Sequence, residues 1–80
     1  MVDLFFDPTF KNKFKKIKDK ILKERIIKQV SKIKENPEVG KPMRYIRKGT
    51  RELYISPFRL SYKFENNTVY ILDLYHKDEQ

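Results

Sequence analysis

The sequence predicts an α+β fold whose elements follow a β-α-α-β-β-β order. Two patterns of helical spacing occupy the first half of the chain, and three runs of strand-forming residues occupy the last third. The 80 residues are expected to form one domain (1–80), because a chain of this length supports only one small core. We therefore expect an N-terminal helical hairpin packed on one face of a small, mainly antiparallel sheet.

The first strand and the first helix are predicted by the opening residues. Residues 2–6 form a short apolar run that is rich in strand formers. Asp7 follows as an expected helix N-cap, and Pro8 suits the first helical position. After them, apolar side chains recur with helical spacing at Phe10, Phe14, Ile17 and Ile21.

The second helix is predicted by a change of phase in this apolar pattern. Continuing the first stripe would require apolar residues near Glu24 and Lys28, which are charged. The apolar stripe that follows is out of phase and consists of Leu22, Ile26, Val30 and Ile33. The pattern therefore predicts two helices that meet near residues 18–23. The second is expected to stop at Asn36–Pro37, because proline disfavours a helical conformation in the residue before it.

The segment after the helices is predicted to be mostly irregular. Residues 38–42 form the longest expected loop, and residues 43–47 form a short strand or extended segment. Residues 48–50 carry a turn signal. The next strand is therefore expected to begin at Arg51.

Three consecutive strands are predicted in the last third of the chain. Residues 51–56 alternate between polar and apolar side chains, and Ser56–Pro57 predicts the turn that follows. Residues 65–67 predict a hairpin connection, because asparagine tolerates positive φ. Residues 68–75 are nearly all apolar, as expected of a central strand. The middle strand lies between the Ser56–Pro57 turn and the hairpin connection. One of its faces is expected to carry Phe58, Leu60, Tyr62 and Phe64, and the other Arg59, Ser61 and Lys63.

The net charge of +8 is the strongest signal in the composition. Residues 1–40 carry 11 Lys/Arg against 6 Asp/Glu, and residues 41–80 carry 8 against 5. Because both halves are basic, the charge favours a polyanionic partner, either nucleic acid or an acidic protein. The alternatives are a solvated lysine face on the helices and an adaptation to high temperature.

The composition also excludes several kinds of site. The chain has no cysteine and one histidine, so we expect neither disulfides nor a metal site. Its two glycines exclude a glycine-rich phosphate loop, and no cofactor is expected. No apolar run approaches the roughly 20 residues that span a bilayer. We therefore expect a cytoplasmic protein without a membrane partner.

The basic and aromatic residues of the last third suit the cleavage of RNA without a metal. This reaction removes a proton from the ribose 2′-OH, stabilises a dianionic phosphorane and protonates the leaving 5′-oxygen. Arginine suits the second task, histidine, tyrosine or lysine can transfer protons, and aromatic rings can stack bases. Each candidate also has an ordinary structural explanation, since tyrosines favour strands and arginines often lie on exposed strand faces. The candidates are Arg44, Arg47, Lys48, Arg51, Tyr54, Arg59, Tyr75, His76 and Lys77.

Several sequence motifs resemble the RelE/ParE toxin superfamily of toxin–antitoxin systems. The run from Phe58 to Tyr62 matches the family's aromatic residue followed by arginine, an aliphatic residue and a tyrosine. The strand from Ile71 to Lys77 matches its aliphatic strand that ends in a His/Arg/Lys cluster. Asn36–Pro37 with Gly40 resembles the loop after the family's second helix, and residues 51–53 resemble its strand opening. The resemblance covers essentially the whole chain in element order and length.

The resemblance implies a partner antitoxin that wraps the toxin and occludes its site. For the RelE-like branch it implies ribosome-dependent cleavage of mRNA in the A site, with Arg59 on the scissile phosphate. It also implies that His76 and Lys77 take part in proton transfer or phosphate binding. RelE enzymes place two lysines on the strand before the arginine, where this chain has Glu52 and Tyr54. Other ribosome-dependent members use a Glu/Arg/His arrangement, which implies Glu52 as a base.

The preferred hypothesis is therefore a metal-independent mRNA endoribonuclease toxin that inhibits translation, with the antitoxin, the ribosome and mRNA as partners. Its expected catalytic residues are Arg59, His76 and Glu52. Its expected RNA-binding residues are Arg44, Arg47, Lys48, Arg51, Tyr54 and Lys77. The missing lysine pair leaves open a ParE-like toxin that poisons DNA gyrase by binding. A decayed toxin or a non-toxic basic binding module is the remaining alternative.

Overall fold

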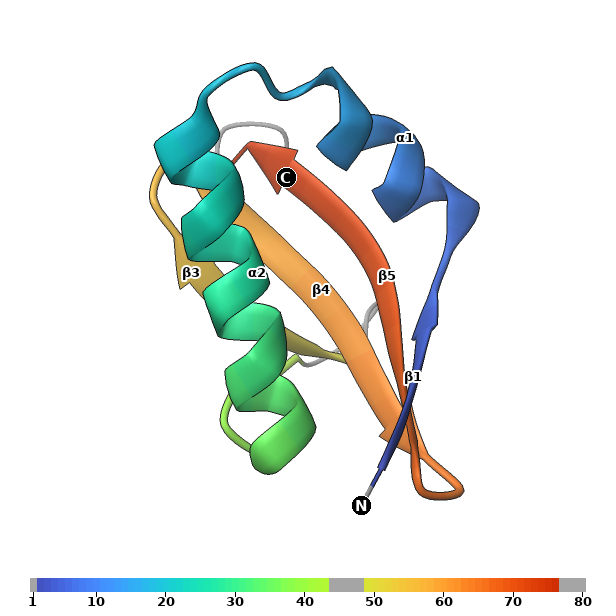
Figure 1. Cartoon of the computed structure of the whole chain (residues 1–80). Helices are drawn as coiled ribbons and strands as arrows, with labels where there is room; N and C mark the ends of the chain where they lie inside the picture. The colour runs from blue at the N-terminus through green and yellow to red at the C-terminus, as the bar shows by residue number, and fades with distance from the viewer. Residues whose placement is uncertain (1, 44–48, 77–80) are drawn as a thin grey trace.

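The computed structural model describes residues 2–43 and 49–76, and it has the predicted α+β architecture. Its strands form one five-stranded sheet in the order β1-β5-β4-β3-β2 (Figure 1). β1 runs parallel to β5, and the other neighbouring strands are antiparallel. The elements are β1 (Asp3–Phe6), α1 (Pro8–Lys16), α2 (Lys20–Glu35), β2 (Lys41–Pro42), β3 (Arg51–Ile55), β4 (Phe58–Glu65) and β5 (Thr68–His76).

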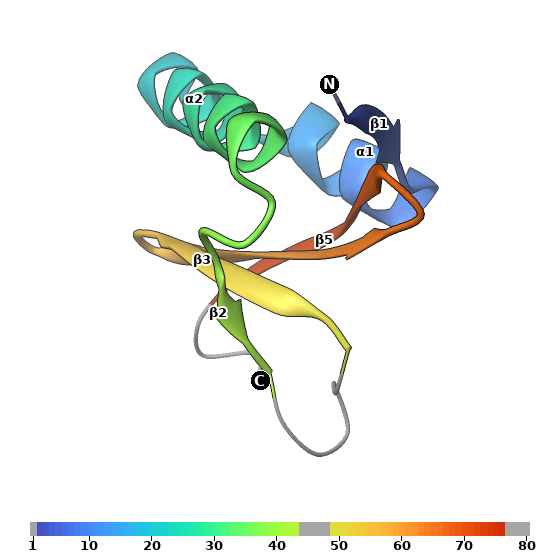
Figure 2. The ribbon, with the colours of Figure 1, turned by 90° about the horizontal axis from the view of Figure 1, so that it is seen from below.

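Both helices lie on the same side of the sheet, as predicted (Figure 2). α1 packs against β5, and α2 packs against β3. We call the opposite side the open face, because no helix of the described residues covers it (Figure 2). None of the described helices is long and apolar enough to cross a membrane.

The break between the two helices is confirmed, and it lies at residues 17–19. The Asp7 carboxylate caps α1 by accepting a hydrogen bond from the backbone N–H of Thr9 at 2.8 Å. Asp19 caps α2 in the same way. The assignment of Ile21 to the first apolar stripe is wrong. Because α2 begins at Lys20, Ile21 lies in its first turn and is 71% exposed.

The core lies between the helices and the covered side of the sheet. The second stripe is confirmed, since Ile26, Val30 and Ile33 of α2 are buried. Burying an aliphatic or aromatic side chain of this size contributes about 1.5–3 kcal/mol, so this layer holds the helices on the sheet. Its other buried members are Phe10, Ile55, Leu60, Tyr62, Val69, Ile71 and Leu74.

The predicted loop at residues 38–42 is wrong at its end. Lys41 and Pro42 form a two-residue strand that pairs with Glu52 and Arg51. Proline is compatible with this place, because β2 is an edge strand. The predicted extended segment at residues 43–47 lies mostly outside the described residues.

A β-bulge in β5 decides which side chains reach each face. Ser61 pairs with Asp73 whereas Tyr62 pairs with Ile71, so Leu72 is an extra residue in β5. Before the bulge the buried residue is Ile71, and after it the buried residue on the same face is Leu74. Because of this extra residue, the side chains after Leu72 lie on the opposite face of the sheet from the one predicted by regular alternation.

Candidate functional site

The central strands align a row of polar and aromatic side chains on the open face. Arg59 of β4 pairs with Tyr54 of β3 on one side and with Tyr75 of β5 on the other. Glu52 lies two residues before Tyr54 and therefore shares its face. Directly opposed residues of an antiparallel pair lie on the same face, so these four side chains form one group, the open-face cluster.

The guanidinium of Arg59 lies against a carboxylate and an aromatic ring, and the side chain remains partly exposed to solvent. Its Nη1 lies 3.5 Å from Oε1 of Glu52, and its Cζ lies 5.8 Å from the centre of the Tyr54 ring. The Glu52 side chain is only 3% exposed, whereas that of Arg59 is 37% exposed. Tyr54 is 52% exposed, and Tyr75 is buried. The arrangement presents a guanidinium and an aromatic ring side by side to solvent, which suits a phosphate next to an unstacked base.

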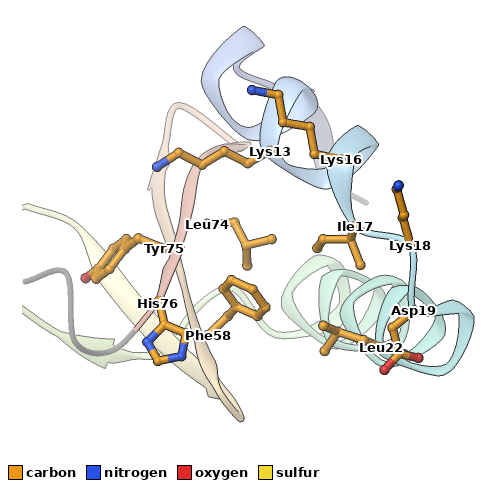
Figure 3. A pocket seen from close by; sticks show the side chains of 10 residues that line it. All are labelled: Lys13, Lys16, Ile17, Lys18, Asp19, Leu22, Phe58, Leu74, Tyr75 and His76. Carbon is orange, nitrogen blue, oxygen red and sulfur yellow. The ribbon is translucent and has the colours of Figure 1, made fainter.

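His76 lies on the other face of the sheet. It pairs with Phe58, and the two rings are edge to face with centroids 5.8 Å apart. Both residues line a pocket of about 410 Å³ at the junction of the helices. Figure 3 shows Tyr75 pointing away from Phe58 and Leu74, which face the pocket. The sequence predicted Arg59 and His76 as one catalytic set, and the register places them on opposite faces.

Arg51 also lies on the covered side, where it binds the loop after α2. Its Nη1 donates to the carbonyl oxygens of Glu38 at 3.1 Å and Gly40 at 2.8 Å. Next to it, the Tyr62 hydroxyl donates to the Pro37 carbonyl and accepts from the Gly40 N–H, both at 2.8 Å. We call Arg51, Tyr62 and Gly40 the loop latch. These contacts give Arg51 a structural task away from the open-face cluster.

Gly40 is required in the latch because two chain segments approach closely there. A Cβ at this position would lie 2.7 Å from both the hydroxyl oxygen and Cε1 of Tyr62. Burial raises the pKa of the Tyr62 phenol above its ordinary value of 10.0, while the bond from Gly40 and the charge of Arg51 act in the opposite direction.

The structure therefore brings together four of the residues named from the sequence, Glu52, Tyr54, Arg59 and the buried Tyr75. It places Arg51 and His76 on the covered side. Among the described residues, no group of three His, Cys, Asp or Glu side chains gathers as a metal site would require. The predicted residues Arg44, Arg47, Lys48 and Lys77 lie outside the described residues.

Sequence reasoning missed two features of these surfaces. At the far end of the open face, the Lys63 ammonium lies 5.0 Å from the centre of the Tyr70 ring, which contacts Phe5 at 5.6 Å. Strand alternation indicated the side of Lys63, but the parallel pairing of β1 was not predicted. The pocket beside His76 was also missed, because it forms only where both helix ends meet the strand ends.

Comparisons with known proteins gave a match to one family model and matches to solved structures of the same fold. The sequence model described as the ParE toxin of type II toxin–antitoxin system, parDE, matches residues 4–80. The structure is similar to the RelBE2 toxin–antitoxin complex from Mycobacterium tuberculosis. That match has a TM-score of 0.80 and 26% identity, and it covers 95% of this chain and 98% of that one.

Two further solved structures show the same fold at lower identity. The YoeB/ParE toxin from Agrobacterium tumefaciens matches with a TM-score of 0.84 and 14% identity, covering 92% of this chain and 96% of that one. The intact E. coli RelBE complex matches with a TM-score of 0.78 and 18% identity, covering 95% and 96%. No curated protein sequence matches this chain.

Proposed function

The chain belongs to the ParE toxin family of type II toxin–antitoxin systems, and from this premise we propose that it is a ribosome-dependent mRNA endoribonuclease. It would act in the cytoplasm on mRNA in the ribosomal A site and so arrest translation. Its regulator would be a cognate antitoxin, since the similar RelBE2 and RelBE structures are toxin–antitoxin complexes.

The observation that carries this proposal is the position of Arg59 on the open face. It projects from β4, a strand paired on both sides, so its backbone is rigid. The Glu52 carboxylate and the Tyr54 ring lie beside the guanidinium, while the Arg59 side chain stays 37% exposed to solvent. A phosphate can therefore bind there without first displacing a helix or strand of the described residues.

The proposed chemistry needs no metal. Arg59 would donate hydrogen bonds to the non-bridging oxygens of the scissile phosphate and stabilise the dianionic phosphorane. Tyr54 would stack an unstacked base beside it. The burial of Glu52 favours a positioning role, in which its carboxylate orients Arg59, over the proton abstraction that the family resemblance implies.

The proton transfers require an acid and a base near the scissile phosphate. His76 remains the predicted acid or base, although its register position faces away from Arg59. Tyr75 lies on the same face as Arg59 but is buried. A cleavage mechanism that uses His76 therefore requires the RNA to reach around the end of β5.

A direct test is cleavage of mRNA on translating ribosomes, mapped by primer extension. We expect the wild-type protein to cut in the A site and Arg59→Ala to be inactive. Lys28→Ala, which removes an exposed positive charge from α2, is the matched control and should cut like the wild type. If wild type and Arg59→Ala are equally inert, the proposal fails.

The second candidate is a ParE-like toxin that poisons DNA gyrase by binding. The observation that favours it is the separation of His76 from Arg59, since a binding toxin needs no acid or base beside its arginine. The same preparation should then produce gyrase-dependent DNA breaks without cutting mRNA. Absence of such breaks would remove this candidate.

A further inference from the structure

The pocket beside His76 combines an apolar floor with a positive rim (Figure 3). It lies where the end of α1 and the start of α2 meet the ends of β4 and β5, and its volume is about 410 Å³. Lys13, Lys16 and Lys18 stand at its rim, and Figure 3 shows their ammonium groups directed away from the apolar side chains. The floor consists of Ile17, Leu22, Phe58 and Leu74.

The positive charge of this rim is only partly compensated. The Lys13 ammonium lies 2.9 Å from the Asp73 carboxylate, so this lysine is already paired. The carboxylate of Asp19 accepts hydrogen bonds from backbone N–H groups at the start of α2. Lys16 and Lys18 are exposed and form no ion pair with another described residue. Two positive charges therefore remain available beside an apolar surface.

We propose that this pocket binds an acidic segment of the antitoxin. One large apolar side chain would fill the floor between Phe58 and Leu22, and neighbouring carboxylates would pair with Lys16 and Lys18. This inference rests on the proposed function in one respect, the existence of an antitoxin. It does not depend on RNA cleavage, because the pocket and Arg59 lie on opposite faces of the sheet.

The chemistry of the floor favours a peptide over RNA. A nucleobase carries polar edges that lose water on burial, and the four floor side chains offer them no hydrogen-bond partners. The polar side chains of the lining, which are Asp19, Tyr75, His76 and the lysines, lie around this floor (Figure 3). A leucine or phenylalanine side chain has no such polar edge. An apolar side chain flanked by carboxylates would pack on the floor and pair with the lysines of the rim. The volume of the pocket lies within the range of small-ligand pockets.

A second pocket provides an internal comparison. It has a volume of about 440 Å³ and lies between α1, α2 and β1, with Phe6, Phe14 and Ile27 in its lining. The lysine in its lining is Lys11. An acidic apolar peptide that binds through both features should therefore prefer the pocket beside His76, whereas an apolar probe alone would enter either pocket.

The test is a titration of the isotope-labelled chain, followed by its amide NMR signals, with a short peptide of four glutamates around one central leucine. We expect shifts confined to residues 13–22, Phe58 and residues 74–76, with a dissociation constant of roughly 1 mM or lower. A peptide with serine in place of leucine should bind at least about tenfold more weakly, because the floor loses its anchor.

Charge-reversed variants of the chain complete the test. The double variant Lys16→Glu/Lys18→Glu should weaken binding at least about tenfold. Lys28→Glu/Lys34→Glu changes the charge equally on the exposed side of α2 and should leave binding within about twofold. Unchanged amide spectra elsewhere would show that both double variants fold.

Equal binding of the leucine and serine peptides would overturn the proposal, and so would an equal loss of peptide binding in both double variants. Two further results would also overturn it. These are shifts centred on the second pocket, and binding at this pocket by a uridine hexanucleotide but not by the peptide. Each is distinguishable from failure of the proposed function, because the ribosome assay reports cleavage independently of the peptide. Peptide binding without mRNA cleavage would refute only the endoribonuclease proposal.

Discussion

Two arginines on neighbouring strands show how differently the two faces of this sheet use the same side chain. Arg51 lies on the covered side, where its guanidinium donates to the carbonyl oxygens of Glu38 and Gly40. Arg59 lies on the open face, where a buried carboxylate and an exposed ring hold it and its end faces solvent. Arg51 therefore joins β3 to the loop after α2 through hydrogen bonds, whereas Arg59 is accessible to a ligand.

Residue type and strand position therefore do not assign a role by themselves. Both arginines were candidates for RNA binding, and both follow the same period-two alternation. The loop that returns after α2 places backbone carbonyls around Arg51 only. Substitutions on each face should therefore have different effects on cleavage and on stability.

Arg59→Met should have the largest effect, because it removes the proposed phosphate ligand and leaves the Glu52 carboxylate without its arginine. We expect cleavage of ribosome-bound mRNA to fall by about 10²-fold or more. The free energy of unfolding should fall by about 1–3 kcal/mol, measured by urea denaturation.

The double variant Glu52→Gln/Arg59→Met is the control for this ion pair. Because it removes both charges, its loss of stability should be smaller than the sum of the two single losses. Strict additivity would mean that the two side chains do not interact across their 3.5 Å separation.

Gly40→Ala should destabilise the covered side by about 1–3 kcal/mol, because the new Cβ collides with the Tyr62 ring and hydroxyl. Denaturation of Gly40→Ala in a Tyr62→Leu background provides the check, since leucine lacks both colliding atoms. The alanine should then cause a smaller additional loss, because only the 3.0 Å approach to the Glu52 backbone oxygen remains. An undiminished additional loss would refute the collision with Tyr62.

Arg51→Met should reduce the free energy of unfolding by about 1–2 kcal/mol, because it removes two charge-assisted hydrogen bonds at a partly exposed site. Once corrected for the folded fraction, mRNA cleavage should stay within about twofold of wild type. Thermal unfolding and the ribosome assay, run on the same preparation, measure the two effects separately.

Tyr62→Phe should show the smallest effect, and its size should depend on pH. The pKa of Tyr62 is raised in the fold, so between 10.0 and that raised pKa the unfolded chain has lost the phenol proton while the folded chain keeps it. The folded state binds more protons in this window, and wild-type stability therefore falls as the pH rises.

The stability advantage of wild type over Tyr62→Phe should be about 1 kcal/mol at neutral pH and should shrink as the pH rises above 10.0. Denaturation curves of both proteins across this range give the difference directly. An advantage that grows with pH would contradict a raised pKa.

The sequence predicted the helices and strands more accurately than the face of the sheet on which each side chain lies. Asp7 with Pro8 is a local signal for the start of the first helix, and this start is confirmed. The phase change between the apolar stripes is a local signal for the break between the helices, which is also confirmed. The bulge at Leu72 carries no such signal, because an apolar residue fits a regular strand equally well. This one residue determines that Tyr75, and not His76, shares a face with Arg59.

Long-range contacts account for what else was not predicted at the candidate site. Nothing near Glu52 in the sequence indicates that its carboxylate is buried, since its burial follows from how the strands assemble. Likewise, the contacts of Arg51 depend on a loop more than ten positions away in the chain. Such environments follow from tertiary packing, whereas caps and turns follow from local chemistry.

A paired comparison of Arg59→Lys and Arg51→Lys in the ribosome cleavage assay separates the roles of the two arginines. Lysine keeps the positive charge at each position but lacks the planar set of guanidinium donors. The experiment therefore shows which of the two arginines acts through the geometry of its guanidinium. We expect a loss of about tenfold or more for Arg59→Lys and near wild-type cleavage by folded Arg51→Lys. An equal or larger loss in Arg51→Lys would contradict the assignment of the two faces.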